Sequence, residues 1–307
     1  MIPPMSRERA FLDLLTPLAG HPAARGFADD AAVLHVSAGP LVLTHDMIVE
    51  GVHYLSGDPP QDVAWKLVAV NLSDLAAKGA RPVGVLLGYA LGATTGYDAA
   101  FIAGLAEALD TFDVPLLGGD TVRMPEGAPR AYGLTAIGAG HPSGTPSRAG
   151  AKPGDILYAT GSIGAAGLGL AISRGEIEGP AEWLAAYRRP WPRLAEGRAL
   201  APLVHAMADI SDGLLIDAAR MAKASGLALE IDLDAVPVEG EDRISAVTAG
   251  DDYELLFAAP PGLSLSQPNL ARISAIGRFA PGKGLVLRDG NGPVPLPKRL
   301  GFEHGTP

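Results

Sequence analysis

Short apolar runs and helix-like apolar patterns alternate along both halves of the chain, and this alternation constrains the fold most. The run 131–139 has the length of one strand, whereas the apolar residues within 11–18 recur at helical spacing. Because both patterns occur in each half, they predict an α/β or α+β protein. The segment 141–154 is rich in Pro, Gly and Ser, so it predicts a boundary between domains 1–142 and 143–307.

The same patterns predict individual elements. Helices are expected at 11–18, 60–79, 97–112, 183–204 with breaks at its prolines, and 213–225, with another after Gly164. Strands are expected at 40–43, 83–91, 114–117, 131–139, 155–160, 206–210, 227–233 and 253–259, and a hairpin is expected after Pro281. Polar residues follow two of these strands, since Thr44-His45-Asp46 and Gly118-Gly119-Asp120 are expected at strand ends.

The composition excludes several classes of site and partner. The chain of 307 residues has no cysteine, which excludes disulfides, thiolate metal sites and a cysteine nucleophile. Its net charge of −10 is unsuited to nucleic-acid binding, which needs a basic patch. No apolar stretch approaches the ~20 residues that span a bilayer, and the first residues lack a signal-peptide pattern. We therefore expect a soluble cytoplasmic protein that binds neither nucleic acid nor membrane.

Aspartates recur at the ends of apolar runs or in loops of small residues. They lie in Ala28-Asp29-Asp30-Ala31, Thr44-His45-Asp46, Asn71-Leu72-Ser73-Asp74, Gly118-Gly119-Asp120 and Asp209-Ile210-Ser211-Asp212-Gly213. A carboxylate beside apolar residues needs a partner, because desolvating it alone costs too much free energy. Few of the 24 basic residues lie near these positions, so a divalent cation is the natural partner. Oxygen ligands favour Mg²⁺ or Mn²⁺.

Plain structural interpretations of these residues stay open. An aspartate after a strand often caps a helix or forms an Asx turn, and Asp212 precedes the helix expected at 213–225. The segment 161–167 either cradles a phosphate through its N–H groups or only packs tightly, and Arg148 is either a phosphate contact or a solvated side chain. The sequence has neither a P-loop nor a dinucleotide-binding glycine motif.

In order, the motifs resemble one enzyme family. They are Asp29-Asp30-Ala31-Ala32, Thr44-His45-Asp46-Met47-Ile48-Val49-Glu50-Gly51-Val52-His53-Tyr54, Asn71-Leu72-Ser73-Asp74-Leu75-Ala76-Ala77, Gly118-Gly119-Asp120-Thr121, Arg148 with Gly150-Ala151-Lys152-Pro153-Gly154-Asp155, Asp209-Ile210-Ser211-Asp212-Gly213-Leu214 and Asp251-Asp252-Tyr253-Glu254-Leu255-Leu256. This series resembles the thiamine-monophosphate kinase family of the PurM-like superfamily, from about residue 25 to the C-terminus.

The resemblance implies a fold and a reaction. It implies a two-domain PurM-like chain and a homodimer in which the N-terminal mixed sheets form a barrel. It also implies phosphorylation of thiamine monophosphate to thiamine diphosphate, with ATP as donor and several Mg²⁺ ions. Both substrates carry phosphate, so cations are needed to offset their repulsion.

The resemblance also implies roles for individual residues. The implied metal ligands are Asp30, Thr44, His45, Asp46, Asp74, Asp120, Asp209 and Asp212, of which Asp46, Asp120 and Asp212 carry the catalysis. ATP is expected to contact Gly119, Asp120, Arg148 and Ser211. The thiamine end is expected to contact His53, Asp251 and Phe302, where a carboxylate and an aromatic ring favour the thiazolium cation.

Two other classes of protein fit parts of the pattern. One is another PurM-like enzyme, such as aminoimidazole ribonucleotide synthetase, whose motif lacks the Val49–His53 run in this form, or selenophosphate synthetase, which normally needs a cysteine or selenocysteine. The other is a non-catalytic relative that binds nucleotide or metal. The intact aspartate series favours an enzyme, and we expect Asp46, Asp74, Asp120 and Asp212 to converge on one metal cluster.

Overall fold

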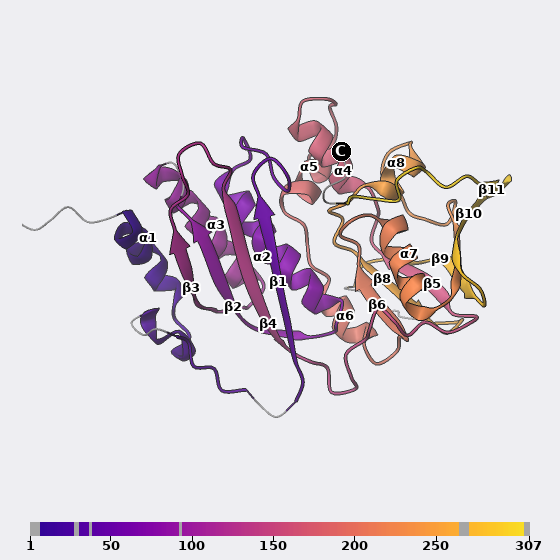
Figure 1. The fold of residues 1–307 in the computed structure, drawn as a ribbon, viewed down its shortest axis with the longest axis horizontal. Helices are drawn as coiled ribbons and strands as arrows, with labels where there is room; N and C mark the ends of the chain where they lie inside the picture. The colour runs from indigo at the N-terminus through magenta and orange to yellow at the C-terminus, as the bar shows by residue number, and fades with distance from the viewer. Residues whose placement is uncertain (1–6, 28–30, 37–38, 92–93, 264–269, 304–307) are drawn as a thin grey trace, which may run out of the picture. The chain divides into compact units, whose positions relative to one another are not determined.

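The computed structural model describes residues 7–27, 31–36, 39–91, 94–263 and 270–303. Packing divides the chain into two compact units. Unit 1 comprises Met1–Leu75 and Pro82–Ala139, and unit 2 comprises Ala76–Arg81 and Gly140–Pro307. Both units mix helices with sheets, as the alternating patterns predicted (Figure 1). The domain boundary after residue 142 stays a prediction.

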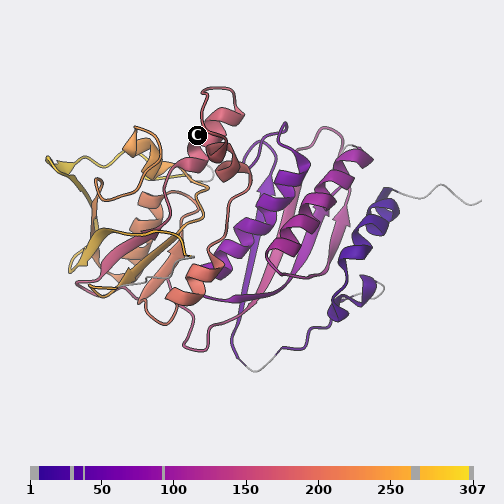
Figure 2. The ribbon, with the colours of Figure 1, turned by 180° about the vertical axis from the view of Figure 1, so that it is seen from behind.

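Unit 1 is a four-stranded sheet in the order β1-β4-β2-β3, and helices α2 and α3 cover one of its faces (Figures 1 and 2). Strands β1 and β4 pair antiparallel along nine residues, whereas β2 and β3 pair in parallel. The elements are α1 (Arg7–Leu15), η1 (Thr16–Leu18), η2 (Pro22–Phe27), β1 (Leu41–Val49), α2 (Pro60–Ala76), β2 (Arg81–Ala90), α3 (Thr95–Thr111), β3 (Leu116–Val122) and β4 (Ala131–Ala139).

The core of unit 1 is rich in aromatic side chains. The ring of Tyr89 stacks on Phe11 with 4.2 Å between centroids, and lies 5.0 Å from the ring of Tyr132. Phe11 thereby ties α1 to the sheet. Gly104 lets α3 approach the start of α2, because a Cβ there would come within 2.2 Å of the carbonyl oxygen of Gln61. Large buried rings and close helix contact both favour a rigid platform.

Unit 2 contains a seven-stranded sheet in the order β11-β10-β7-β9-β5-β8-β6. Its elements are β5 (Ile156–Thr160), α4 (Ala165–Ser173), α5 (Ala181–Arg188), α6 (Leu194–Leu200), β6 (Ala206–Asp209), α7 (Leu214–Ser225), β7 (Ala228–Asp232), α8 (Arg243–Thr248), β8 (Leu255–Ala259), β9 (Ile273–Ala280), β10 (Gly284–Asp289) and β11 (Gly292–Val294). The apolar face of α7 joins the core through Leu214, Leu215 and Met221. Its predicted helix is confirmed, as is the hairpin of β10 and β11.

Three expectations about elements need correction. The helix expected at 183–204 is two helices, α5 and α6, because the prolines between them remove donors and clash with a continuing helix. Residues 44–46 and 118–120 lie inside β1 and β3 rather than at strand ends, because pairing with β4 and β2 continues through them. The strand expected at 83–91 is confirmed as β2, which lies in the interior of the sheet between β4 and β3.

Candidate functional site

In unit 1, strand β1 directs two predicted metal ligands toward helix α2. The hydroxyl of Thr44 donates to Oδ2 of Asp74, and the backbone N–H of Asp46 donates to Oδ1 of Asn71 at 2.8 Å. Asn71 is fully buried and its amide also donates to the carbonyl of Leu67. Asn71 therefore holds β1 against α2, a role that the sequence hinted at only by placing it one turn before Asp74.

His45 lies on the other face of β1, because successive residues of a strand alternate. It lines a cavity of about 660 Å³ together with Gly119 and Asp120 of β3. Its Nδ1 is 2.9 Å from the hydroxyl of Thr135 on the paired strand β4. The structure thus separates His45 from Thr44 and groups it with two of the residues predicted to bind ATP.

Gly119 has a specific structural reason to be glycine. Its φ is +157°, and a Cβ would lie 1.9 Å from the carbonyl oxygen of Leu87 on the neighbouring strand. Only glycine fits such an approach. Asp120 beside it is exposed, and its Oδ1 accepts the N–H of Thr121 at 2.9 Å.

His53 follows β1 in a turn. Its Nδ1 accepts the backbone N–H of Val49 at 3.0 Å, so a neutral ring carries its proton on Nε2. The buried ammonium of Lys66 donates to the carbonyl oxygen of His53 at 2.9 Å. Lys66 therefore fixes the backbone that presents the imidazole, a contact that the sequence did not indicate.

In unit 2, the loop after β6 brings several predicted site residues together. The carbonyl of Ser211 accepts the N–H of Asp251, and the carbonyl of Asp212 accepts the N–H of Phe302, both at 2.8 Å. Ser211, Asp212, Asp251 and Phe302 thus share one knot of backbone hydrogen bonds, which we call the 211 knot. Phe302 is 44% exposed.

A buried carboxylate that the sequence analysis missed supports this knot. Oδ2 of Asp217, on α7, accepts the backbone N–H groups of Ser211 and Asp212, both at 3.1 Å. Arg220 donates to Oδ1 of Asp217 and to Oδ2 of Asp212. Asp212 is thus paired with a guanidinium in this structure, while burial raises the pKa of Asp217. The only sequence signal was the position of Asp217 in the first turns of a helix.

Two more predicted site residues, Asp209 and Arg148, belong to unit 2. Asp209 ends β6 and is buried. Arg148 is exposed in a loop whose next residues are fixed, since Ser225 Oγ accepts the N–H groups of Gly150 and Ala151 at 3.2 Å. The predicted ligand Asp30 lies outside the described residues.

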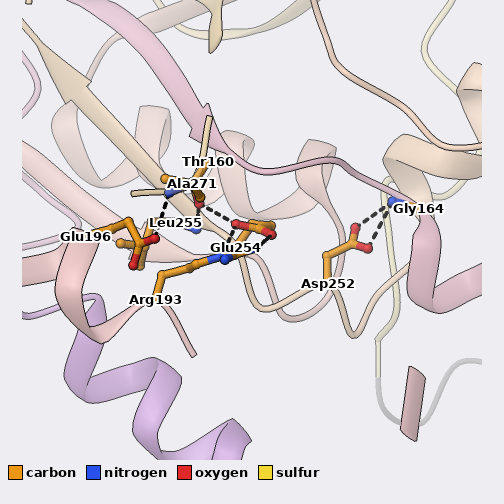
Figure 3. Close-up of polar contacts among 8 residues, drawn as sticks. All are labelled: Thr160, Gly164, Arg193, Glu196, Asp252, Glu254, Leu255 and Ala271. Carbon is orange, nitrogen blue, oxygen red and sulfur yellow. Dashed lines mark hydrogen bonds and ion pairs between the residues drawn. The ribbon is translucent and has the colours of Figure 1, made fainter. Parts of the chain in front are cut away.

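At the glycine-rich start of α4, the N–H group of Gly164 already has a protein partner. Both carboxylate oxygens of Asp252 accept the N–H of Gly164, at 2.9 and 3.0 Å (Figure 3). This favours the packing interpretation of segment 161–167. Desolvation raises the pKa of Asp252 well above its ordinary value, and the nearby carboxylates of Glu254 and Asp251 add to the rise.

We expect this raised pKa to make stability depend on pH. Because folding raises the pKa of Asp252, its contribution to the free energy of unfolding is largest at about pH 4 and falls as pH rises toward the folded pKa. Urea unfolding should therefore show that the wild type loses stability relative to Asp252→Asn as the pH rises from 4 to 7. A difference that stays constant over this range would contradict the assignment.

The candidate metal ligands are oxygen donors, apart from His45, which suits a hard cation such as Mg²⁺. Within the described part of the chain, no group of three or more His, Asp or Glu side chains is arranged to hold a metal ion. Convergence of the aspartates on one cluster therefore stays a prediction. No helix among the described residues is both long and apolar enough to cross a membrane.

Comparisons with known proteins cover both units. The model for the N-terminal domain of AIR synthase related proteins matches residues 28–139, and that for the C-terminal domain matches 152–290. The thiamine-monophosphate kinase of Caulobacter vibrioides is 40% identical over 317 residues, covering 95% of this chain and 89% of the relative.

Solved structures agree with this match. The thiamine-monophosphate kinase of Stenotrophomonas maltophilia aligns with a TM-score of 0.76 at 33% identity, covering 85% of this chain and 89% of that one. AaThiL complexed with AMPPCP and TMP aligns with a TM-score of 0.76 at 28% identity, covering 90% and 91%. The order of domains, the length of the match and its identity agree, and the chain belongs to the thiamine-monophosphate kinase family.

Proposed function

We propose that the chain transfers the γ-phosphoryl group of ATP to thiamine monophosphate, forming thiamine diphosphate. The observation that carries this is the 40% identity to the Caulobacter vibrioides enzyme across 95% of the chain. The related AaThiL was solved with AMPPCP, an analogue of ATP, and with TMP. A donor and an acceptor thus bind a protein with the same fold.

The residues suit this chemistry. The acceptor phosphate already carries an ionised oxygen, so the reaction needs positioning and charge neutralisation more than a strong base. Bound Mg²⁺ would supply that neutralisation. We assign Asp46, Asp120 and Asp212 as the catalytic carboxylates, with Asp30, Thr44, His45, Asp74 and Asp209 as further ligands.

The substrate contacts are those that the family resemblance implies, and the grouping of residues within each unit supports them. Gly119 and Asp120 line a cavity in unit 1, and we assign them to ATP together with Arg148 and Ser211. His53 is assigned to the acceptor, as are Asp251 and Phe302. The last two are tied to the 211 knot, so a carboxylate and an aromatic ring are held beside Ser211 and Asp212. That pairing favours an organic cation.

The test is an assay of the purified chain with Mg²⁺ and ATP. Thiamine diphosphate should form from thiamine monophosphate, and ATP should not be consumed with free thiamine or without an acceptor. Chelation of the metal should abolish product. Equal ATP consumption with and without thiamine monophosphate would contradict the proposal, as would formation of thiamine monophosphate from thiamine.

We further propose that the chain is a homodimer formed through the open face of the unit 1 sheet, and that it acts in the cytoplasm. Strand β1 exposes Leu41, Leu43 and Met47 at 44%, 65% and 52%. These residues alternate along β1, so they lie on one face, opposite the face held by α2. Such an apolar stripe favours association, and two such sheets could close a barrel.

Light scattering should therefore give about 63 kDa, twice the chain mass of 31.5 kDa. Leu43→Glu should shift the mass toward the monomer, since a carboxylate in an apolar interface is desolvated without a partner. The matched control is Val286→Glu, at a residue of unit 2 with 47% exposure, which should leave the dimer intact. A wild-type mass of about 31.5 kDa at micromolar concentration would contradict this assignment.

A further inference from the structure

The segment Asp251–Glu254 has an unfavourable backbone. Asp251 has a φ of +70° and Tyr253 a φ of +50°, and neither is glycine. Such left-handed conformations cost free energy in residues with a Cβ, so they persist only where surrounding contacts determine them. Strain of this kind in a loop that holds a candidate substrate residue points to a positioning role.

Two alternate side chains anchor the segment to the rest of unit 2 (Figure 3). Asp252 accepts the N–H of Gly164 at the start of α4. Glu254 is buried, accepts from Arg193 Nε at 2.7 Å and accepts the hydroxyl of Thr160 at 2.5 Å. These two anchors flank Tyr253 in the sequence, so Tyr253 is held from either side.

The backbone of Asp251 and Tyr253 is fixed as well. The N–H groups of Asp251 and Tyr253 donate to the carbonyls of Ser211 and Ile210, both at 2.8 Å. The segment is thereby bound to the 211 knot, beside Asp212. Its conformation is set by contacts on both sides.

Within this segment, the side chain of Tyr253 contacts the carboxylate of Asp251. The phenol hydroxyl of Tyr253 donates to its Oδ1 at 3.1 Å. Tyr253 is only 8% exposed, so its ring has little freedom. A buried ring on a fixed backbone can therefore restrict the rotation of the carboxylate that its hydroxyl contacts.

We propose that Tyr253 is a positioning residue that directs the Asp251 carboxylate toward the cationic end of the acceptor. The inference rests on the proposed function and adds a residue that sets acceptor specificity. A preoriented carboxylate loses less side-chain entropy when the cation binds. ATP has no cationic group of this kind, so Tyr253 should affect the acceptor alone.

The experiment is a double-mutant cycle of Tyr253→Phe and Asp251→Ala, with KM and kcat measured for both substrates. Tyr253→Phe should raise the KM for thiamine monophosphate about 5- to 20-fold, as expected for a lost hydrogen bond to a charged group. The KM for ATP and kcat should stay within about twofold. In the Asp251→Ala background, Tyr253→Phe should change nothing further, because the two residues act as one unit.

Two further measurements separate positioning from folding. The dissociation constant of thiamine monophosphate, measured by calorimetry without ATP, should rise by the same factor as KM. Tyr158→Phe is the matched control: Tyr158 is 7% exposed on β5 and stacks on Phe257, so its substitution should leave both KM values unchanged.

Each other outcome overturns the inference. Unchanged acceptor KM in Tyr253→Phe, equal shifts for both substrates, or additive effects with Asp251→Ala would show that Tyr253 only fills space. If Tyr253→Phe does not fold, Asp251→Ala serves as the test instead. An unchanged KM for thiamine monophosphate in Asp251→Ala would then also overturn the inference. A wild-type chain that forms no thiamine diphosphate would instead overturn the proposed function itself, and this inference with it.

Discussion

Asp120→Asn is expected to lower kcat for thiamine diphosphate formation by about 100-fold or more, with little change in stability. A metal ligand contributes several kcal/mol of charge stabilisation in the transition state, and about 2.7 kcal/mol corresponds to 100-fold. Asp120 suits this test because it is exposed and its carboxylate accepts the N–H of the next residue, Thr121, so the amide should be tolerated.

The matched control is Asp110→Asn, an exposed aspartate near the end of α3 that carries the same charge change. Its kcat should stay within about twofold of wild type, since a distant surface charge is screened. Titration with Mg²⁺ should also show a weaker apparent affinity in Asp120→Asn. Equal kcat values for the two variants would contradict a catalytic role for Asp120.

Local sequence patterns predicted helices and strands well where the structure of a segment depends mainly on its own residues. The strand expected at 131–139 is β4 without change, and the helix expected at 213–225 is α7 to within one residue. In both cases the apolar period and the flanking glycines act locally. The break between α5 and α6 was also signalled by prolines, although not the full separation into two helices.

Strand pairing could not be predicted in the same way. Residues 44–46 were expected at a strand end because polar residues usually stop a strand, yet β4 supplies partners through residue 49. The alternation of β1 then places His45 and Thr44 on opposite faces. A one-residue difference in register would exchange those faces, and nothing in a single segment fixes the register of its partner.

The candidate site was predicted as a set of residues rather than as a geometry. Motif order selected Ser211, Asp212, Asp251 and Phe302, and the structure links their backbones in the 211 knot. The hydrogen bonds that link them are made by backbone N–H and C=O groups, which every residue other than proline carries. The amino-acid sequence therefore does not show which residues make them. Asp217 was missed because an acid in the first turn of a helix usually faces solvent.

Arg193→Met is expected to lower the free energy of unfolding by about 3–5 kcal/mol. Glu254 is 5% exposed, and Arg193 donates to both of its carboxylate oxygens (Figure 3). Methionine keeps much of the length of the side chain but removes the charge, so a buried carboxylate would lose its ionic partner. The hydroxyl of Thr160 would remain as a donor, which alone cannot offset the desolvation of a carboxylate.

The matched control is Arg174→Met, which breaks an ion pair with Glu176 whose side chains are 51% and 57% exposed. Solvent already screens that pair, so its loss should cost less than about 1 kcal/mol. Urea unfolding followed by circular dichroism compares both variants with wild type. Adding Glu254→Gln to Arg193→Met should recover part of the lost stability, because it removes the unpaired charge.

Equal losses in Arg193→Met and Arg174→Met would mean that Glu254 does not depend on Arg193. Anchoring of the Asp251–Glu254 segment would then have to come from Asp252 and the backbone bonds to residues 210 and 211.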